Sequence, residues 1–281
     1  MGRPAIVFWM FVLLLLPAVE VFPQGSLSKT SRVGCSNCAD DGSLVSRSLQ
    51  KADELYAAFK PKEALPELLK VLDLDPQNAE ALSKAARVYI DFGDAIPEST
   101  PDWEAKRLKQ YQIAEQYARR AVKADPSMVW GHFYVAASLG SMATVSPVAK
   151  QIDMAGEIRS AIEKAIAIDP KNGYAYHVYG IWHRKMAEIG KMSRMFASVI
   201  YGRSIPAGSI EKSIEYLNKA VALNPTVIAS RLELARSYVA VENWSSARSF
   251  LTSIGGLPIQ FSDDAKHKQK AEQLLEEIKA R

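Results

Sequence analysis

The chain lacks the side-chain patterns that carry most enzyme catalysis. Its 281 residues include only four histidines, His132, His177, His183 and His267. None of them has the His-Glu-x-x-His spacing of a helical zinc site, and the sequence has neither a nucleophile motif nor a phosphate-binding glycine loop. Its carboxylates are spread along helical stretches, with no spacing that would bring a catalytic pair together. We therefore expect a non-enzymatic protein with no cofactor and no metal site.

Cysteine is nearly absent, since the sequence holds only Cys35 and Cys38. A structural zinc site takes about four ligands, and no second pair is present. A haem attachment would need a histidine where the sequence has Ala39, and a thioredoxin-like site would need a βαβ context that the sequence lacks. In an exported chain the pair favours a local disulfide between Cys35 and Cys38, and the sequence leaves its redox state open.

A strong excess of charge of either sign is also missing. The sequence has 35 basic and 31 acidic residues, a net charge of +4, and no dense basic block. A nucleic-acid-binding surface normally shows as a clustered basic patch or stripe. We therefore expect no nucleic-acid partner.

One long apolar run stands at the N-terminus, where residues 5–19 follow Arg3. This pattern is typical of an export signal, but Glu20 ends the run and no clean cleavage motif follows. We predict a signal peptide or an N-terminal membrane anchor over residues 1–25, and leave open which of the two it is. A flexible linker with the cysteine pair would cover 26–43 and a helical domain 44–281. Both alternatives make the domain periplasmic or extracellular.

A recurring helix stop organises the rest of the chain. An apolar, alanine-rich run ends four times at an acidic or amide residue followed by proline, at Asp75-Pro76, Asp125-Pro126, Asp169-Pro170 and Asn224-Pro225. Proline stops a helix because its ring clashes with the preceding turn and its nitrogen has no hydrogen to donate. Small residues recur at matching offsets around these stops, which resembles the 34-residue, two-helix tetratricopeptide repeat. We predict an all-α, right-handed solenoid of about five helix pairs over 44–254, closed by a capping helix within 262–281.

The repeat is longer than 34 residues. Successive prolines are 50, 44 and 55 residues apart, so the three steps carry about 16, 10 and 21 extra residues. Because the patterns on both sides stay in phase, the extra residues should lie between the first helix (helix A) and the second helix (helix B) of a pair. We expect the insert over 189–210 to lengthen its helix A.

The same region carries a more specific resemblance. The stretch from Gly180 to Trp182, the segment from Tyr201 to Ser209, Ala220 and the stop at Asn224-Pro225 are together similar to the regulator of microtubule dynamics family. This resemblance implies a non-enzymatic helical protein. Family members are linked to microtubules, and one membrane-anchored branch to organelle contacts and phospholipid transfer. Microtubules are an expected partner only if the domain is cytosolic.

Two binding hypotheses follow. In the first, the concave groove lined by helix A binds a protein or peptide, since Trp and Arg make strong anchors in desolvated sites. Counting helical positions from the small packing residues of each helix A places the following residues on the groove: Arg87, Trp130, Phe133, Tyr174, His177, Ile181, Arg184, Leu232 and Arg236. The alternative is binding or transfer of a phospholipid or other amphiphile at a membrane surface through an apolar helical stripe with basic flanks. That stripe consists of Met192, Met195, Phe196, Val199 and Ile200, with Arg194.

Overall fold

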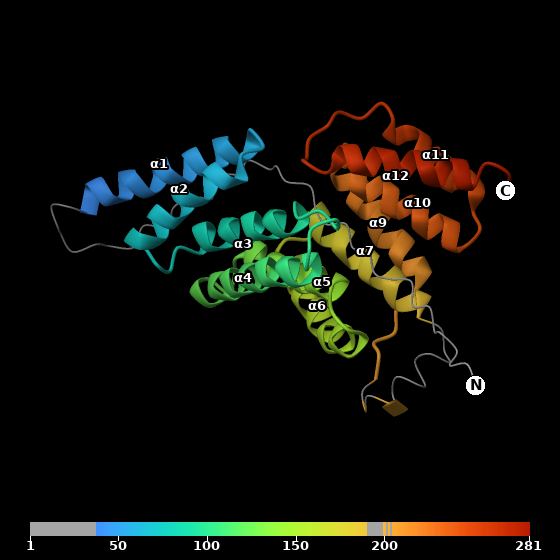
Figure 1. Ribbon diagram of the computed structural model, residues 1–281, viewed down its shortest axis with the longest axis horizontal. Helices are drawn as coiled ribbons and strands as arrows, with labels where there is room; N and C mark the ends of the chain where they lie inside the picture. Colours follow the sequence, from blue (N-terminus) through green and yellow to red (C-terminus); the bar gives the residue numbers. More distant parts are fainter. Residues whose placement is uncertain (1–37, 190–198, 201, 203) are drawn as a thin grey trace.

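The computed structural model describes residues 38–281 apart from 190–198, 201 and 203. This part of the chain consists of helices joined by short connections, without a β-strand (Figure 1). The helices are α1 Cys38–Ala57, α2 Pro61–Leu74, α3 Ala79–Asp94, α4 Trp103–Ala124, α5 Val129–Thr144, α6 Val148–Ile168, α7 Gly173–Glu188, α9 Ile210–Leu223, α10 Ile228–Ala240, α11 Trp244–Ile254 and α12 Asp264–Glu277. Helix α1 begins at Cys38, so the last part of the segment predicted as a linker is helical.

The helices pack as five antiparallel pairs in chain order. The pairs are α1 with α2, α3 with α4, α5 with α6, α7 with α9, and α10 with α11. Each pair also packs on the next, and α12 lies against α10 and α11 at the C-terminal end (Figure 1). The predicted tetratricopeptide-like solenoid with a capping helix is thus confirmed.

The repeated stops behave as their chemistry requires. Helices α2, α4, α6 and α9 each end one residue before the Asp or Asn that precedes proline. In three of the four turns the Asp side chain accepts a hydrogen bond from the backbone N–H two residues on, at 2.8 to 3.2 Å. Asn78 and Asn172 then cap the N-termini of α3 and α7. One short motif therefore ends a helix B and begins the next helix A.

Small residues let the two helices of a pair approach closely. Ala86, Ala136 and Ala235 are fully buried at matching positions of their helices A. Gly180 is the extreme case, because a Cβ placed on it would lie 2.5 Å from Cγ of Leu217 in helix B. Only glycine fits at that distance, so a backbone crossing sets the residue type here.

The first two inserts lengthen helix B. Helices α4 and α6 have 22 and 21 residues, whereas α2 and α9 have 14. The expectation that the third insert lengthens helix A is wrong. Helix α7 ends at Glu188 after 16 residues, the same length as α3 and α5, and Ile189 has an extended backbone. Gly190 follows in the sequence, and glycine favours a helix end over continuation.

The connection between α11 and α12 crosses back toward the middle of the solenoid (Figure 1). Its Phe261 is buried in the central core, a cluster built mainly from α3 to α7 that also holds Phe133 and Trp182. The capping helix is thus attached to the fold at two places: its own apolar face on α10 and α11, and the aromatic ring that precedes it.

Candidate functional site

The residues predicted to line the groove fall into two groups by exposure. Six are buried: Phe133, Tyr174, His177, Ile181, Arg184 and Leu232. Arg87, Trp130 and Arg236 are partly exposed. Phe133, Ile181 and Leu232 are core side chains, exposed by no more than 2%. A binding partner would therefore contact Arg87, Trp130 and Arg236 before any of the buried side chains.

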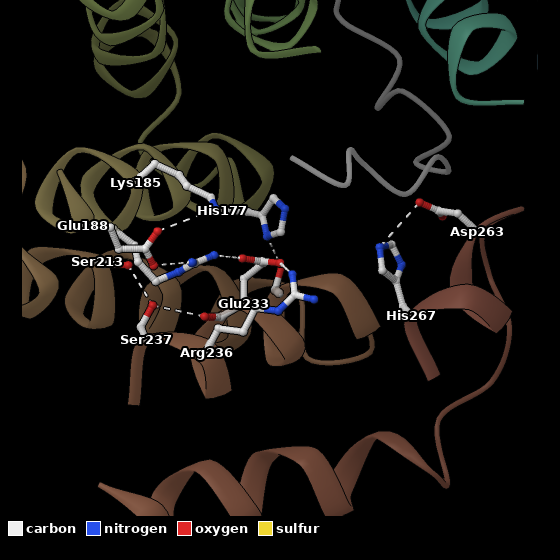
Figure 2. A network of polar contacts seen from close by, with 11 residues as sticks. His177, Lys185, Glu188, Ser213, Glu233, Arg236, Ser237, Asp263 and His267 are labelled. Carbon is white, nitrogen blue, oxygen red and sulfur yellow. Dashed lines mark hydrogen bonds and ion pairs between the residues drawn. The ribbon is translucent and has the colours of Figure 1, made fainter. Parts of the chain in front are cut away.

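A buried ion network joins α7 to α10. The guanidinium of Arg184 donates to the carboxylate of Glu233, and Arg236 donates to the other oxygen of the same carboxylate. Arg184 also donates to Glu188 at 2.7 Å. The side chains of Arg184 and Glu233 are only 5% and 4% exposed, so this pair lies in a low-dielectric environment. Figure 2 shows Glu233 and Arg236 of α10 facing His177 of α7.

The two arginines keep Glu233 ionised. Burial by itself would raise the pKa of this carboxyl, but the charges of Arg236 and Arg184 outweigh burial and lower its pKa to about 2. The network is therefore charged at any physiological pH. Its carboxylate is fully engaged within the protein, which argues against a role as a general base.

His177 lies beside this network and is neutral. Its Nδ1 is 3.0 Å from Oγ of Ser230, and burial lowers its pKa to about 4. Its other ring nitrogen, Nε2, has no hydrogen-bond partner in the described part of the chain. His183 packs among Tyr179, Trp182 and Tyr216, and burial lowers its pKa to about 4 as well. The hydroxyl that His177 contacts belongs to Ser230, which is itself buried.

A second charged cluster lies on α1 and α3. Lys84 is buried and contacts Asp53 at 2.7 Å and Glu80 at 2.6 Å. The guanidinium of Arg87 lies 3.3 Å above the ring of Tyr56, whose hydroxyl donates to Asp91. These contacts fix the direction of the Arg87 side chain before any partner arrives.

Aromatic rings surround Trp130 at the start of α5. Its ring centroid is 5.4 Å from that of Phe133 and 6.0 Å from those of Tyr134 and Tyr174. These spacings are typical of favourable aromatic pairs. Trp130 is therefore held in one orientation while part of it stays exposed.

A third polar group stands at the start of α12. Asp263 is the residue before the helix, and Asp264 is its first residue. His267 follows one turn later and lies beside Asp263 (Figure 2). Asp264 and His267 are exposed by 0% and 1%. Burial raises the pKa of Asp263 to about 6, with the negative charge of Asp264 adding to the effect and His267 opposing it.

The predicted membrane stripe is described only at its end. Val199 and Ile200 are 79% and 68% exposed, whereas Met192, Arg194, Met195 and Phe196 lie outside the described residues. The predicted disulfide also falls outside, because Cys35 precedes the described part and only the backbone is described at Cys38. Among the described helices, none has the length and hydropathy of a transmembrane span.

One cavity has almost wholly apolar walls. It lies between α5, α6 and α7, and its volume is about 30 Å³, roughly the space of one water molecule. Trp182 and Met186 line it together with small residues of α5, and Lys185 and Gln151 supply its polar atoms. The cavity thus has an apolar interior and one cationic side chain.

The sequence pattern missed several of the polar contacts. Glu233 is not among the residues predicted to line the groove. It stands three residues before Arg236 on the same helix, a spacing at which two side chains are in contact. Lys84 and the group at the start of α12 were missed for a different reason. Their burial depends on packing between helices, which spacing along one helix does not reveal.

Known proteins are similar to this chain in sequence, and a solved structure has the same kind of helical-repeat fold. The family model described as "Regulator of microtubule dynamics protein 1-3" matches residues 48–279. Regulator of microtubule dynamics protein 1 of Bos taurus is 28% identical over 228 residues, covering 81% of this chain and 70% of the relative. The Mus musculus protein of that name is 26% identical, covering 82% and 74%. A thermophilic TPR protein from Thermus thermophilus has a similar fold, with a TM-score of 0.60, 16% identity and coverage of 82% of this chain and 98% of that one. The chain belongs to the regulator of microtubule dynamics protein 1-3 family.

Proposed function

We propose that this protein is a non-enzymatic scaffold that binds a protein or peptide partner on the helix-A side of its solenoid. One observation carries the proposal: Arg87, Trp130 and Arg236 are partly exposed there, and buried neighbours hold each of them in place. An anchor that is already ordered loses little conformational entropy on binding, so more of its contact energy contributes to affinity. The two arginines favour a segment with acidic side chains or a free carboxylate.

Site-specific photo-crosslinking tests this proposal. A photoreactive amino acid replaces Arg87 or Arg236 in separate full-length chains, and Arg119 on α4 serves as the control position because it is 46% exposed on a helix B. We expect positions 87 and 236 to capture the same partner and position 119 to miss it. Reversing the charge with Arg87→Glu should then weaken binding of the purified partner by at least about tenfold, as expected for an anchor arginine. Equal capture at all three positions would contradict the proposal.

A membrane role is the second candidate. It is supported by the exposed apolar side chains of Val199 and Ile200. These side chains would insert into the apolar part of a membrane surface. Organic extracts of the purified protein, analysed by mass spectrometry, should contain a bound lipid. Val199→Ser with Ile200→Ser should reduce liposome binding, and Val241→Ser, at a 42% exposed position on another helix pair, should not. Lipid-free extracts together with no liposome binding would refute this role.

We further propose that the helical domain is exported, on the basis of the apolar run after Arg3. Protease protection of a tagged C-terminus in fractionated cells tests the location. The relatives bear the name of microtubule regulators. A cytosolic domain in that experiment would make microtubules the partner to test first, by cosedimentation.

A further inference from the structure

Three side chains with metal-binding atoms meet at the start of α12. One potential ligand atom each from Asp263, Asp264 and His267 can be chosen so that all three lie within 4.8 Å of one another. Nε2 of His267 is 3.7 Å from the Asp263 carboxylate, and its Nδ1 is 3.9 Å from that of Asp264. These separations exceed a normal hydrogen bond, so the contacts are long ion pairs that require a protonated His267.

Four polar atoms of this cluster are buried and lack hydrogen bonds. Oδ1 of both aspartates and both ring nitrogens of His267 have no hydrogen-bond partner within the described residues. The other oxygen of Asp264 accepts from the backbone N–H of Gln260 at 2.8 Å and of Phe261 at 2.9 Å. These two bonds fix the orientation of the carboxylate and leave Oδ1 available to a ligand. Buried polar atoms in native proteins are almost always satisfied, so this cluster lacks a partner that a cation would supply.

We propose that Asp263, Asp264 and His267 bind one divalent transition-metal ion of the zinc class. Two carboxylate oxygens and one imidazole nitrogen suit zinc and its borderline neighbours, whereas magnesium and calcium prefer oxygen ligands alone. Bonds of about 2.0 to 2.1 Å in a tetrahedral site separate the ligand atoms by roughly 3.3 Å. One ion can bind only one ring nitrogen of His267, and the three ligand atoms lie within 4.8 Å of one another, so the side chains would close by up to about 1.5 Å on binding. Water would take the remaining position, and Asp263, 16% exposed, offers the route of entry.

The local charge favours a cation. The N-terminus of α12 carries roughly half a positive charge, which opposes metal binding, but two carboxylates outweigh it. Two further acids on α3 lie close enough for their charges to interact with that of Asp263. Burial raises the pKa of Asp91 and of Asp94 to about 7, and the charge of Asp263 contributes to both shifts. A bound divalent ion would offset the repulsion between the end of α3 and the start of α12.

The site has a defined structural consequence. Asp264 already holds the turn that carries Phe261 into the central core. A metal on the free oxygen of Asp264 would connect that turn to His267 one helical turn further on. The metal would thus act as a clamp that keeps the capping helix and its aromatic anchor on the solenoid.

Metal titration of the purified full-length chain tests the proposal. After treatment with a chelator, the protein is titrated with Zn²⁺ by calorimetry and with Co²⁺ by visible absorption, which reports the ligand set. Asp264→Asn keeps an acceptor oxygen for the turn and removes the anionic ligand, and His267→Gln removes the imidazole. His132→Gln, at a histidine bonded to the carbonyl of Pro126, is the matched control. Cys35→Ser with Cys38→Ser removes the thiols, which also bind zinc.

We expect one equivalent of Zn²⁺ to bind and to raise the melting temperature by roughly 5 to 10 °C at a hundredfold excess over the dissociation constant. Asp264→Asn and His267→Gln should each weaken binding by at least about tenfold. The His132 and cysteine variants should bind like the parent. The proposal is overturned if the parent chain binds no zinc at micromolar concentration, or if only the cysteine variant loses binding. Because the parent titration decides the first outcome, a variant that fails to fold does not leave the question open.

Discussion

Replacing Glu233 by alanine should destabilise the fold more than an ordinary surface change. The mutation would leave Arg184, with a 5% exposed side chain, paired only with Glu188, which is 41% exposed. Removing one partner of a buried ion pair typically costs about 3–5 kcal/mol, because the remaining charge stays buried without compensation. We expect a loss of that size in the free energy of unfolding at neutral pH.

The pKa of Glu233 gives a second figure for the same interaction. A fall from 4.5 to about 2 corresponds to on the order of 3 kcal/mol. The pKa is lower in the folded state, so this stabilisation is present above pH 4.5 and is lost as the pH falls through about 2. The parent should therefore lose stability toward acid more steeply than Glu233→Ala does.

Urea unfolding followed by circular dichroism measures both effects. Glu276→Ala is the control, because Glu276 and its partner Lys279 are each 73% exposed and such pairs contribute at most about 1 kcal/mol. The double variant Arg184→Met with Glu233→Leu removes both buried charges and should be clearly more stable than Glu233→Ala alone. A loss below about 1 kcal/mol in Glu233→Ala, or a double variant as unstable as the sum of its single changes, would refute the reasoning.

Three further outcomes are expected. Gly180→Ala should lower the free energy of unfolding by about 1–3 kcal/mol, because its Cβ would clash with Leu217. Gly156→Ala, with nothing within 4 Å of its Cβ, should raise it by up to about 1 kcal/mol. Thermal melts of the two variants distinguish a packing effect from helix propensity. The pKa of His177 is lowered to about 4, so the free energy of unfolding should rise with pH between about 4 and 6.5. In urea unfolding at a series of pH values, His177→Gln should reduce the slope of that rise by up to about 1.4 kcal/mol per pH unit. Asn172→Ala should cost about 1 kcal/mol in the same assay, since it removes the cap of α7, and an unchanged midpoint would contradict the capping role.

The site was less predictable from sequence than the fold. Arg87 and Arg236 were found by helical phase alone and are partly exposed, while His177, Ile181 and Leu232 share that phase and are buried. The position of a residue along the helical repeat indicates which side of the helix it lies on. It does not indicate how closely the next helix pair packs against that side. The group at the start of α12 does not follow the His-Glu-x-x-His pattern, because His267 lies four residues after Asp263 and three after Asp264.

What the sequence determined by itself is local. The four Asp/Asn-Pro stops, the alanines at matching offsets and the family resemblance predicted the helix pairs, because these signals act within a few residues of one another. Only the tertiary structure decided that the first two inserts lengthen α4 and α6 and that the third does not lengthen α7. The tertiary structure alone places Arg184 against Glu233, which is 49 residues away in the sequence, and places Phe261 in the core formed by α3 to α7. Such contacts depend on how complete helix pairs stack, and no short stretch of sequence records that geometry.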